Sequence, residues 1–184
     1  AIPFLESSFN PKAVSKVDAA GIWQFMKYTN NLFMPKKTKV IDYRKNPFIS
    51  SVAALHMLKE NRLILRRWDM AITAYNSGTR NLVNARKKYR KKKNLDLAYV
   101  LDHFKSKSLG FASKNFYSEF LALVHALAYK EIIYPLEGLE KHMKALDSTV
   151  NIYVSKCKIK PKKFFKLHRK SSPHIEDLNP HFLK

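Results

Sequence analysis

The sequence predicts a mainly α-helical protein, with one helical domain followed by a small C-terminal α/β appendage. Apolar residues recur at roughly the 3.6-residue period of a helix in several stretches before residue 134. With 184 residues, of which 46% are hydrophobic and only 4 are Gly, the chain can bury the core of one domain. Apolar and polar residues then alternate over 149–154, which is typical of a strand. We therefore expect a domain over 1–146 and a small extension over 147–184, packed on that domain.

The clearest helical patterns cover residues 52–65, 69–82 and 116–133. The third is the strongest, because its apolar residues form a wide face. The signals that bound or interrupt these helices are Asn46-Pro47, Gly78 and Pro135. Two shorter elements are also expected, a small hairpin over 14–20 and a closing helix over 175–180 that ends at an Asn-Pro pair.

The charge of the chain is strongly positive. Lys and Arg number 35 against 14 Asp and Glu, a formal net charge of +21. Such a field favours polyanions, which include nucleic acid, an anionic membrane surface and a carboxylate-bearing cell wall. The densest basic run, 86–93, is either a solvated helix end or a docking patch for such a polyanion.

The sequence indicates neither a metal site nor a cofactor. The seven His residues show no metal-ligand spacing, and the single cysteine, Cys157, excludes an intrachain disulfide. No apolar stretch is long enough to span a membrane. No signal peptide is visible and the chain begins at Ala, so an export signal has been removed or the chain has been trimmed.

One carboxylate stands out near the N-terminus. Glu6 follows the apolar stretch 2–5 and precedes small polar residues and an Asn-Pro turn signal. An apolar run containing Trp23 comes soon after. A single acid in a partly apolar cleft has a raised pKa, which suits proton donation near neutral pH.

Three motifs in order resemble one enzyme family. They are the run ESSFNPKAVS…GIWQFM from Glu6, the run AYNSG from Ala74, and Asn115-Phe116-Tyr117 at the start of a helix. Together they are similar to the SLT-type lytic transglycosylases of the goose-type lysozyme superfamily (glycoside hydrolase family 23-like), and most similar to the membrane-bound lytic transglycosylase D branch. The resemblance implies a lysozyme-like helical domain that cleaves the β-1,4 bond between N-acetylmuramic acid and N-acetylglucosamine without a metal or cofactor.

The resemblance also implies roles for single residues. Glu6 matches the catalytic acid, which would protonate the glycosidic oxygen and then deprotonate the C6 hydroxyl of the same muramic acid to give a 1,6-anhydro end. The positions that would bind the sugar are Ser15, Gln24, Tyr75, Asn76 and Tyr117. The partners implied are peptidoglycan glycan strands and an anionic envelope surface reached through the basic run, with no specific nucleic acid. We expect an exported monomer that is periplasmic, associated with the outer membrane or secreted.

One residue differs from the family pattern, and two interpretations of its role are possible. Asp18 stands where the family pattern has Gly. It either closes the loop or provides a second acidic group that positions water. The second role would make the protein a hydrolytic lysozyme that leaves reducing ends, possibly on modified glycan such as an N-deacetylated strand. The alternative from another class is a basic protein that binds nucleic acid, although no nucleic-acid-binding motif is present.

Overall fold

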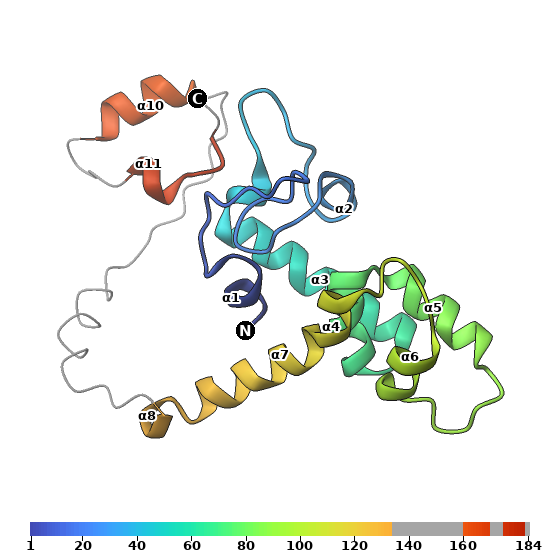
Figure 1. Ribbon diagram of the computed structural model, residues 1–184. Coiled ribbons are helices and arrows are strands. Elements are labelled where there is room, and N and C mark those ends of the chain that lie inside the picture. Colours follow the sequence, from blue (N-terminus) through green and yellow to red (C-terminus); the bar gives the residue numbers. More distant parts are fainter. Residues whose placement is uncertain (134–159, 170–174, 183–184) are drawn as a thin grey trace.

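Helices dominate the computed structural model, which describes residues 1–133, 160–169 and 175–182 (Figure 1). Within these residues there are isolated β-bridges but no strand, so the prediction of a mainly α fold is confirmed. None of the described helices is long and apolar enough to cross a bilayer. The elements are α1 Ile2–Ser7, α2 Lys27–Phe33, η1 Tyr43–Lys45, α3 Pro47–Leu65, α4 Trp68–Ser77, α5 Thr79–Lys88, α6 Leu97–His103, α7 Phe111–Ala128, α8 Lys130–Ile133, α10 Pro161–His168 and α11 Ile175–Leu178.

The α3–α4 pair forms the centre of the domain. The Asn46 side chain caps α3 by accepting hydrogen bonds from the N–H groups of Phe48 and Ile49, both at 3.0 Å. Pro47 occupies the first turn, where its missing N–H costs nothing. The helix therefore begins where the Asn-Pro signal predicts, and it continues to Leu65.

A break at Gly78 separates α4 from α5, as the sequence predicts. Gly78 has φ 85°, a left-handed value that other residues rarely adopt. The buried small residues Ala71 and Ala74 let α4 pack closely between α3 and α7. Two hydrophobic clusters result, one around Trp23 and Phe116 and the other around Leu65 and Leu82.

The prediction for the last long helix was wrong at both ends. The helix α7 begins at Phe111, after Gly110, and it ends at Ala128, so that the short α8 follows before Pro135. Its apolar face is also only partly covered. Phe116 is buried, whereas Leu121 and Leu127 are exposed. The periodicity therefore identified the helix but overestimated the area that its face buries.

The described end of the chain touches the first domain. Phe182 forms an antiparallel bridge with Ile41, and the Asp42 N–H donates to the His181 carbonyl at 2.7 Å. The closing helix α11 confirms the predicted short helix, whereas α10 was not predicted. The predicted strand over 149–154 and the proposed boundary after residue 146 lie outside the described residues.

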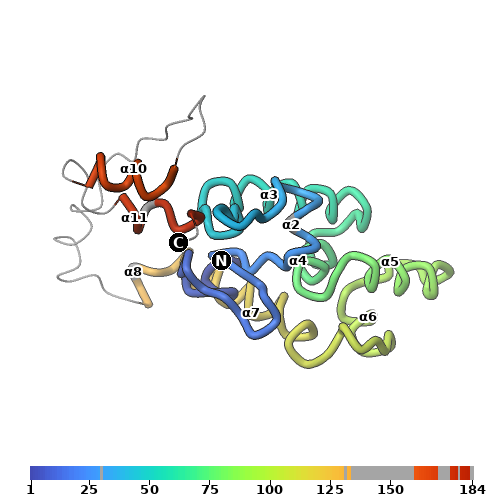
Figure 2. Tube along the Cα trace, turned by 90° about the horizontal axis from the view of Figure 1, so that it is seen from above, coloured from blue at the N-terminus to red at the C-terminus, as the bar shows by residue number. Residues whose placement is uncertain are grey.

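Figures 1 and 2 show from two directions that α1 lies toward one end of the helical domain and that α5 and α6 form the opposite end. We call these the α1 end and the basic end, because α5 carries Arg86, Lys87 and Lys88 in its last turn. The α1 end holds the candidate acid.

Candidate active site

Glu6 lies in the last turn of α1 and is partly buried. Burial penalises the ionised carboxylate and raises the pKa of Glu6 from 4.5 to about 7. A carboxyl with this pKa is protonated in a large fraction of molecules at neutral pH, so it can act as a general acid. The sequence prediction of an acid in a partly apolar setting therefore agrees with the structure.

The residue after Glu6 ties α1 to the loop that carries the second half of the opening motif. The Ser7 hydroxyl donates to the Ile22 carbonyl at 3.1 Å, and it also lies 3.3 Å from the Pro3 carbonyl. Ser8 then ends the helix with φ 50°. The backbone around the acid is thus held against residues 21–25 by a specific hydrogen bond.

Tyr75 of α4 is the predicted site residue that the structure connects most directly to Glu6. Burial, followed by the negative charge of Glu6, holds the pKa of Tyr75 well above its ordinary value. The Tyr75 hydroxyl donates to the Trp23 carbonyl at 2.6 Å. Its ring packs between Trp23, Phe25 and Phe116, with centroid distances of 6.1, 6.2 and 6.5 Å. Tyr75 therefore forms part of the wall near the acid and joins α4 to the loop.

The loop itself depends on Gly21. This residue has φ 78°, and a Cβ at this position would lie 1.8 Å from the Arg44 carbonyl oxygen. Gln24 also has a positive φ of 46°, and its side-chain amide donates to the Gly21 carbonyl at 2.9 Å. The predicted sugar-binding Gln24 thus has one contact within its own loop.

Ser15 organises the preceding turn. Its hydroxyl oxygen accepts hydrogen bonds from the N–H groups of Ala19 at 3.0 Å and Val17 at 3.3 Å. Val14 and Ala20 form an isolated antiparallel bridge, so the predicted hairpin is present as a bridged turn without strands. Because the Ser15 oxygen serves as the acceptor in both contacts, its hydroxyl proton can still be donated to a ligand.

Asp18 lies on the outside of this turn with φ 61°, a conformation that Asp adopts more readily than most residues. Its side chain is 50% exposed, and one carboxylate oxygen lies 3.2 Å from an Arg44 guanidinium nitrogen. The Asp18 carbonyl accepts a second hydrogen bond from the same guanidinium. These contacts close the loop around Arg44.

Arg44 is a residue that the sequence analysis did not single out. Its side chain is only 1% exposed and forms two hydrogen bonds with the Asp42 carboxylate, at 2.9 and 2.8 Å. It also donates to the Phe25 carbonyl at 3.1 Å. Burial opposes ionisation of Asp42, but the hydrogen bonds and charge of Arg44 outweigh it and keep the pKa of that carboxyl below its usual value. The only signal in the sequence is an Asp two positions before an Arg.

The remaining two predicted site residues lie on α4 and α7. The Asn76 side-chain oxygen accepts a hydrogen bond from the Ser113 hydroxyl at 2.6 Å, which joins the two helices. Tyr117 is partly buried where the two hydrophobic clusters meet, and its ring stacks on Phe120 at 6.2 Å. Both residues have structural contacts, and neither forms a hydrogen bond with Glu6 in the part of the chain that the structure describes.

The described residues contain no group of three or more His, Cys, Asp or Glu side chains placed to hold a metal ion. What the site offers is one protonatable carboxyl, an aromatic wall and several hydroxyl and amide groups. That combination suits acid–base chemistry on a neutral polar substrate such as a sugar.

Comparison with known proteins shows which family the chain belongs to. The model of the Transglycosylase SLT domain family matches residues 1–97, which is more than half of the chain and includes Glu6, the loop and the AYNSG run. The chain belongs to the SLT transglycosylase family. The helical fold is thus that of a family member, and the resemblance noted in the sequence is confirmed.

Two curated relatives have a similar sequence. Each is named membrane-bound lytic murein transglycosylase D, one from Escherichia coli strain K12 and one from strain O6:H1. Each is 36% identical over 85 residues, which make up 46% of this chain and 19% of the relative. The chain therefore spans about a fifth of the length of these relatives.

Proposed function

We propose that this chain is the catalytic domain of a peptidoglycan lytic transglycosylase. It would cleave the β-1,4 bond between N-acetylmuramic acid and N-acetylglucosamine and leave 1,6-anhydro-muramic acid ends. The observation that carries the proposal is the buried Glu6, with its pKa raised to about 7, in a member of the SLT family. The name of the curated relatives, lytic murein transglycosylase, supports the substrate.

In the proposed reaction Glu6 acts twice. Its neutral carboxyl gives a proton to the glycosidic oxygen while the bond from this oxygen to C1 of muramic acid breaks. The C6 hydroxyl of the same sugar then attacks C1, and the Glu6 carboxylate takes the proton of that hydroxyl. The new C6–O–C1 bridge closes the anhydro ring and Glu6 is neutral again. No water is consumed, so one carboxyl is sufficient.

The neighbours of Glu6 would bind the sugar and maintain the pKa of the acid. Ser15 can donate its hydroxyl proton, and the side chains of Gln24 and Asn76 can offer further hydrogen bonds. The Tyr75 hydroxyl is already bonded to the Trp23 carbonyl, so Tyr75 would shape the apolar wall that keeps Glu6 protonated. Tyr117 would contribute an aromatic surface from α7.

The hydrolytic alternative depends on Asp18. An acid that positions water works best with a free carboxylate facing the substrate. Asp18 is instead half exposed and paired with Arg44, which favours its role in closing the loop. We therefore propose the anhydro product, and we keep the lysozyme reaction with Asp18 as the second acid as the competing outcome.

Mass spectrometry of digested peptidoglycan tests the proposal. The wild type should release muramic acid with anhydro ends, and Glu6→Gln should release no fragments while it keeps the native circular dichroism spectrum. Glu60→Gln is the matched control, because Glu60 is an exposed residue of α3. Reducing ends in the wild-type digest would contradict the proposed product. Cleavage by a folded Glu6→Gln variant would contradict the proposed acid.

The substrate also indicates where the protein acts. Peptidoglycan lies outside the cytoplasm, so we propose that the protein is exported and acts in the periplasm, at the outer membrane or after secretion. We further propose that it acts as a monomer, since the proposed chemistry uses residues of one chain.

A further inference from the structure

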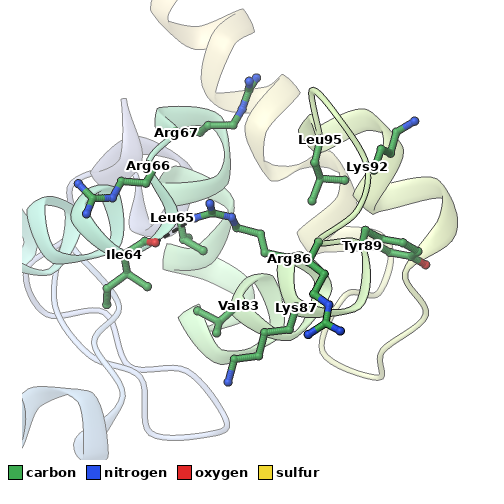
Figure 3. Close-up of a pocket in the computed structure, with 11 residues that line it drawn as sticks. Ile64, Leu65, Arg66, Arg67, Val83, Arg86, Lys87, Tyr89, Lys92 and Leu95 are labelled. Atoms are coloured by element: carbon green, nitrogen blue, oxygen red, sulfur yellow. Dashed lines mark hydrogen bonds between the residues drawn. The ribbon is translucent and has the colours of Figure 1, made fainter.

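A basic pocket lies at the end of the domain away from α1. It has a volume of about 760 Å³ and opens between the turn that joins α3 to α4 and the last turns of α5 (Figure 3). Apolar side chains, among them Ile64 and Leu95, form part of its wall. Its six cationic residues, which we call the basic cluster, are Arg66, Arg67, Arg86, Lys87, Arg90 and Lys92.

Most of the charge in this pocket is not neutralised by nearby carboxylates. No Asp or Glu among the described residues lines the pocket. Arg67 forms an ion pair with Asp69 at 2.8 Å, and Arg86 donates to the Ile64 carbonyl at 3.0 Å. The other four members of the basic cluster form no ion pair with any described residue. Like charges held together in this way attract an anion, and guanidinium groups favour phosphate because they can donate two parallel hydrogen bonds.

One exposed apolar side chain lines the same pocket, and another comes next in sequence after two of its lining residues. Ile64, which lines it, is 51% exposed, and Trp68, which directly follows Arg66 and Arg67, is 55% exposed. The Arg62 guanidinium lies 5.9 Å from the Trp68 ring centroid. A soluble polyanion would need only the cations. The boundary of a lipid bilayer presents phosphate groups and an apolar layer together, and Trp is enriched at that boundary.

The position of the pocket leaves the candidate active site free. The pocket is formed by α5 and the α3–α4 turn, whereas Figures 1 and 2 place α1, which carries Glu6, toward the other end of the domain. A surface bound at the basic end would therefore not cover Glu6. At the α1 end, by contrast, the buried Arg44 is already paired with Asp42 and Asp18.

We propose that the basic end docks on an anionic phospholipid membrane, with lipid phosphates in the basic pocket and with Ile64 and Trp68 at the headgroup boundary. Glu6 then faces away from the bilayer, toward glycan strands if the proposed function is correct. The docking itself depends only on the charge and the exposed apolar side chains of this end.

Sedimentation with vesicles tests the docking. The protein should bind vesicles of phosphatidylcholine mixed with phosphatidylglycerol, and it should bind vesicles of phosphatidylcholine alone weakly. Each cation near an anionic surface strengthens binding about fivefold, so the triple variant Lys87→Gln, Arg90→Gln, Lys92→Gln should bind about 100-fold more weakly. All three side chains are exposed, and the fold should not depend on them.

A second triple variant separates position from total charge. Lys36→Gln, Lys39→Gln, Lys59→Gln removes the same charge from exposed residues outside the pocket, and it should lose much less affinity. An equal loss in both variants would show a general charge effect and would overturn the inference. Equal binding of the wild type to both kinds of vesicle would overturn the role of the net negative charge of the lipid. Binding to duplex DNA, with none to anionic vesicles, would identify a nucleic acid as the partner and would also overturn it.

Trp68→Ala tests the apolar part, since the variant keeps every cation of the basic cluster. It should bind anionic vesicles more weakly than the wild type, and unchanged binding would contradict insertion at the headgroup boundary. Cleavage of short soluble glycan fragments should be the same in all these variants. Vesicle binding without any cleavage would contradict the proposed function alone, and cleavage without vesicle binding would contradict the docking alone.

Discussion

Arginine plays opposite parts at the two ends of this domain. At the α1 end, Arg44 is buried and saturated with partners, and it holds together the loop that follows the candidate acid. At the basic end, Arg66 and Arg90 are exposed and form no ion pair within the described residues. A buried charge requires partners in place, whereas an exposed charge remains available to bind something else. The buried arginine of the α1 end therefore holds the loop in place, whereas the exposed arginines of the basic end can bind an external anion.

The largest expected effect tests this contrast directly. Arg44→Met should destabilise the protein by about 3–5 kcal/mol, because it leaves the buried Asp42 carboxylate without its partner. Arg90→Met, the same substitution at the basic end, should change the free energy of unfolding by less than about 0.5 kcal/mol. Urea denaturation of both variants measures the difference. Equal effects would mean that the Arg44 network does not hold the loop.

The second largest expected effect is a gain in stability, produced by Glu6→Gln. The pKa of Glu6 is raised in the folded protein, so between pH 4.5 and about 7 the native state binds more protons than the unfolded state. The stability of the wild type therefore falls as pH rises through this window. Glu6→Gln removes the penalty, and the variant should be more stable than the wild type by up to about 3 kcal/mol above about pH 8.

Denaturation at several pH values checks this prediction. Below about pH 4 the Glu6→Gln variant and the wild type should have nearly equal stability, because Glu6 is then protonated in both the folded and the unfolded states. The exposed Glu60→Gln should show no such trend. A Glu6→Gln variant that is no more stable than the wild type at high pH would mean that burial does not penalise the ionised acid.

A smaller effect is expected for the hydrogen bond that joins α4 to the loop. Tyr75→Phe leaves the Trp23 carbonyl without its donor, and it should cost about 1–2 kcal/mol. Tyr28→Phe is the matched control, since Tyr28 is 78% exposed and its hydroxyl can bond to water. Thermal unfolding of the two variants measures both values. A cost for Tyr28→Phe as large as that for Tyr75→Phe would contradict the role of this bond.

The smallest effect concerns Asp18. Its pair with Arg44 is half exposed, so Asp18→Asn should cost less than about 1 kcal/mol, and Asn tolerates the positive φ at this position. The digest should contain the same anhydro ends before and after the substitution. A wild-type digest with reducing ends that diminish in Asp18→Asn would instead make Asp18 the group that positions water.

The parts of the fold that local chemistry controls could be predicted from the sequence. Asn46-Pro47 marks the start of α3, and Gly78 separates α4 from α5, because capping and left-handed backbone depend on single residue types. Glu6 could also be recognised as a candidate acid from its apolar neighbours and its motif. The end of α7 could not be predicted, because apolar residues continue to Ile133 although the helix is broken at Tyr129 and α8 begins at Lys130.

Features that depend on tertiary contacts could not be predicted in the same way. Among 35 basic residues only the Asp two positions earlier distinguishes Arg44, and this does not reveal its burial, since its partners come from residues 18, 25 and 42. The basic run 86–93 was recognised as a possible docking patch, but the contribution of the α3–α4 turn to the pocket became visible only in the fold.

The central claim is that burial at the α1 end makes Glu6 an acid that is still protonated near neutral pH. Carbon-13 labelling of the Glu carboxyl groups and an NMR titration measure this most directly, with Glu6→Gln identifying the resonance. One signal should titrate at about pH 7, it should be missing in the variant, and cleavage of peptidoglycan should decline above the same pH. A Glu6 signal that titrates near the ordinary value of 4.5 would contradict the account.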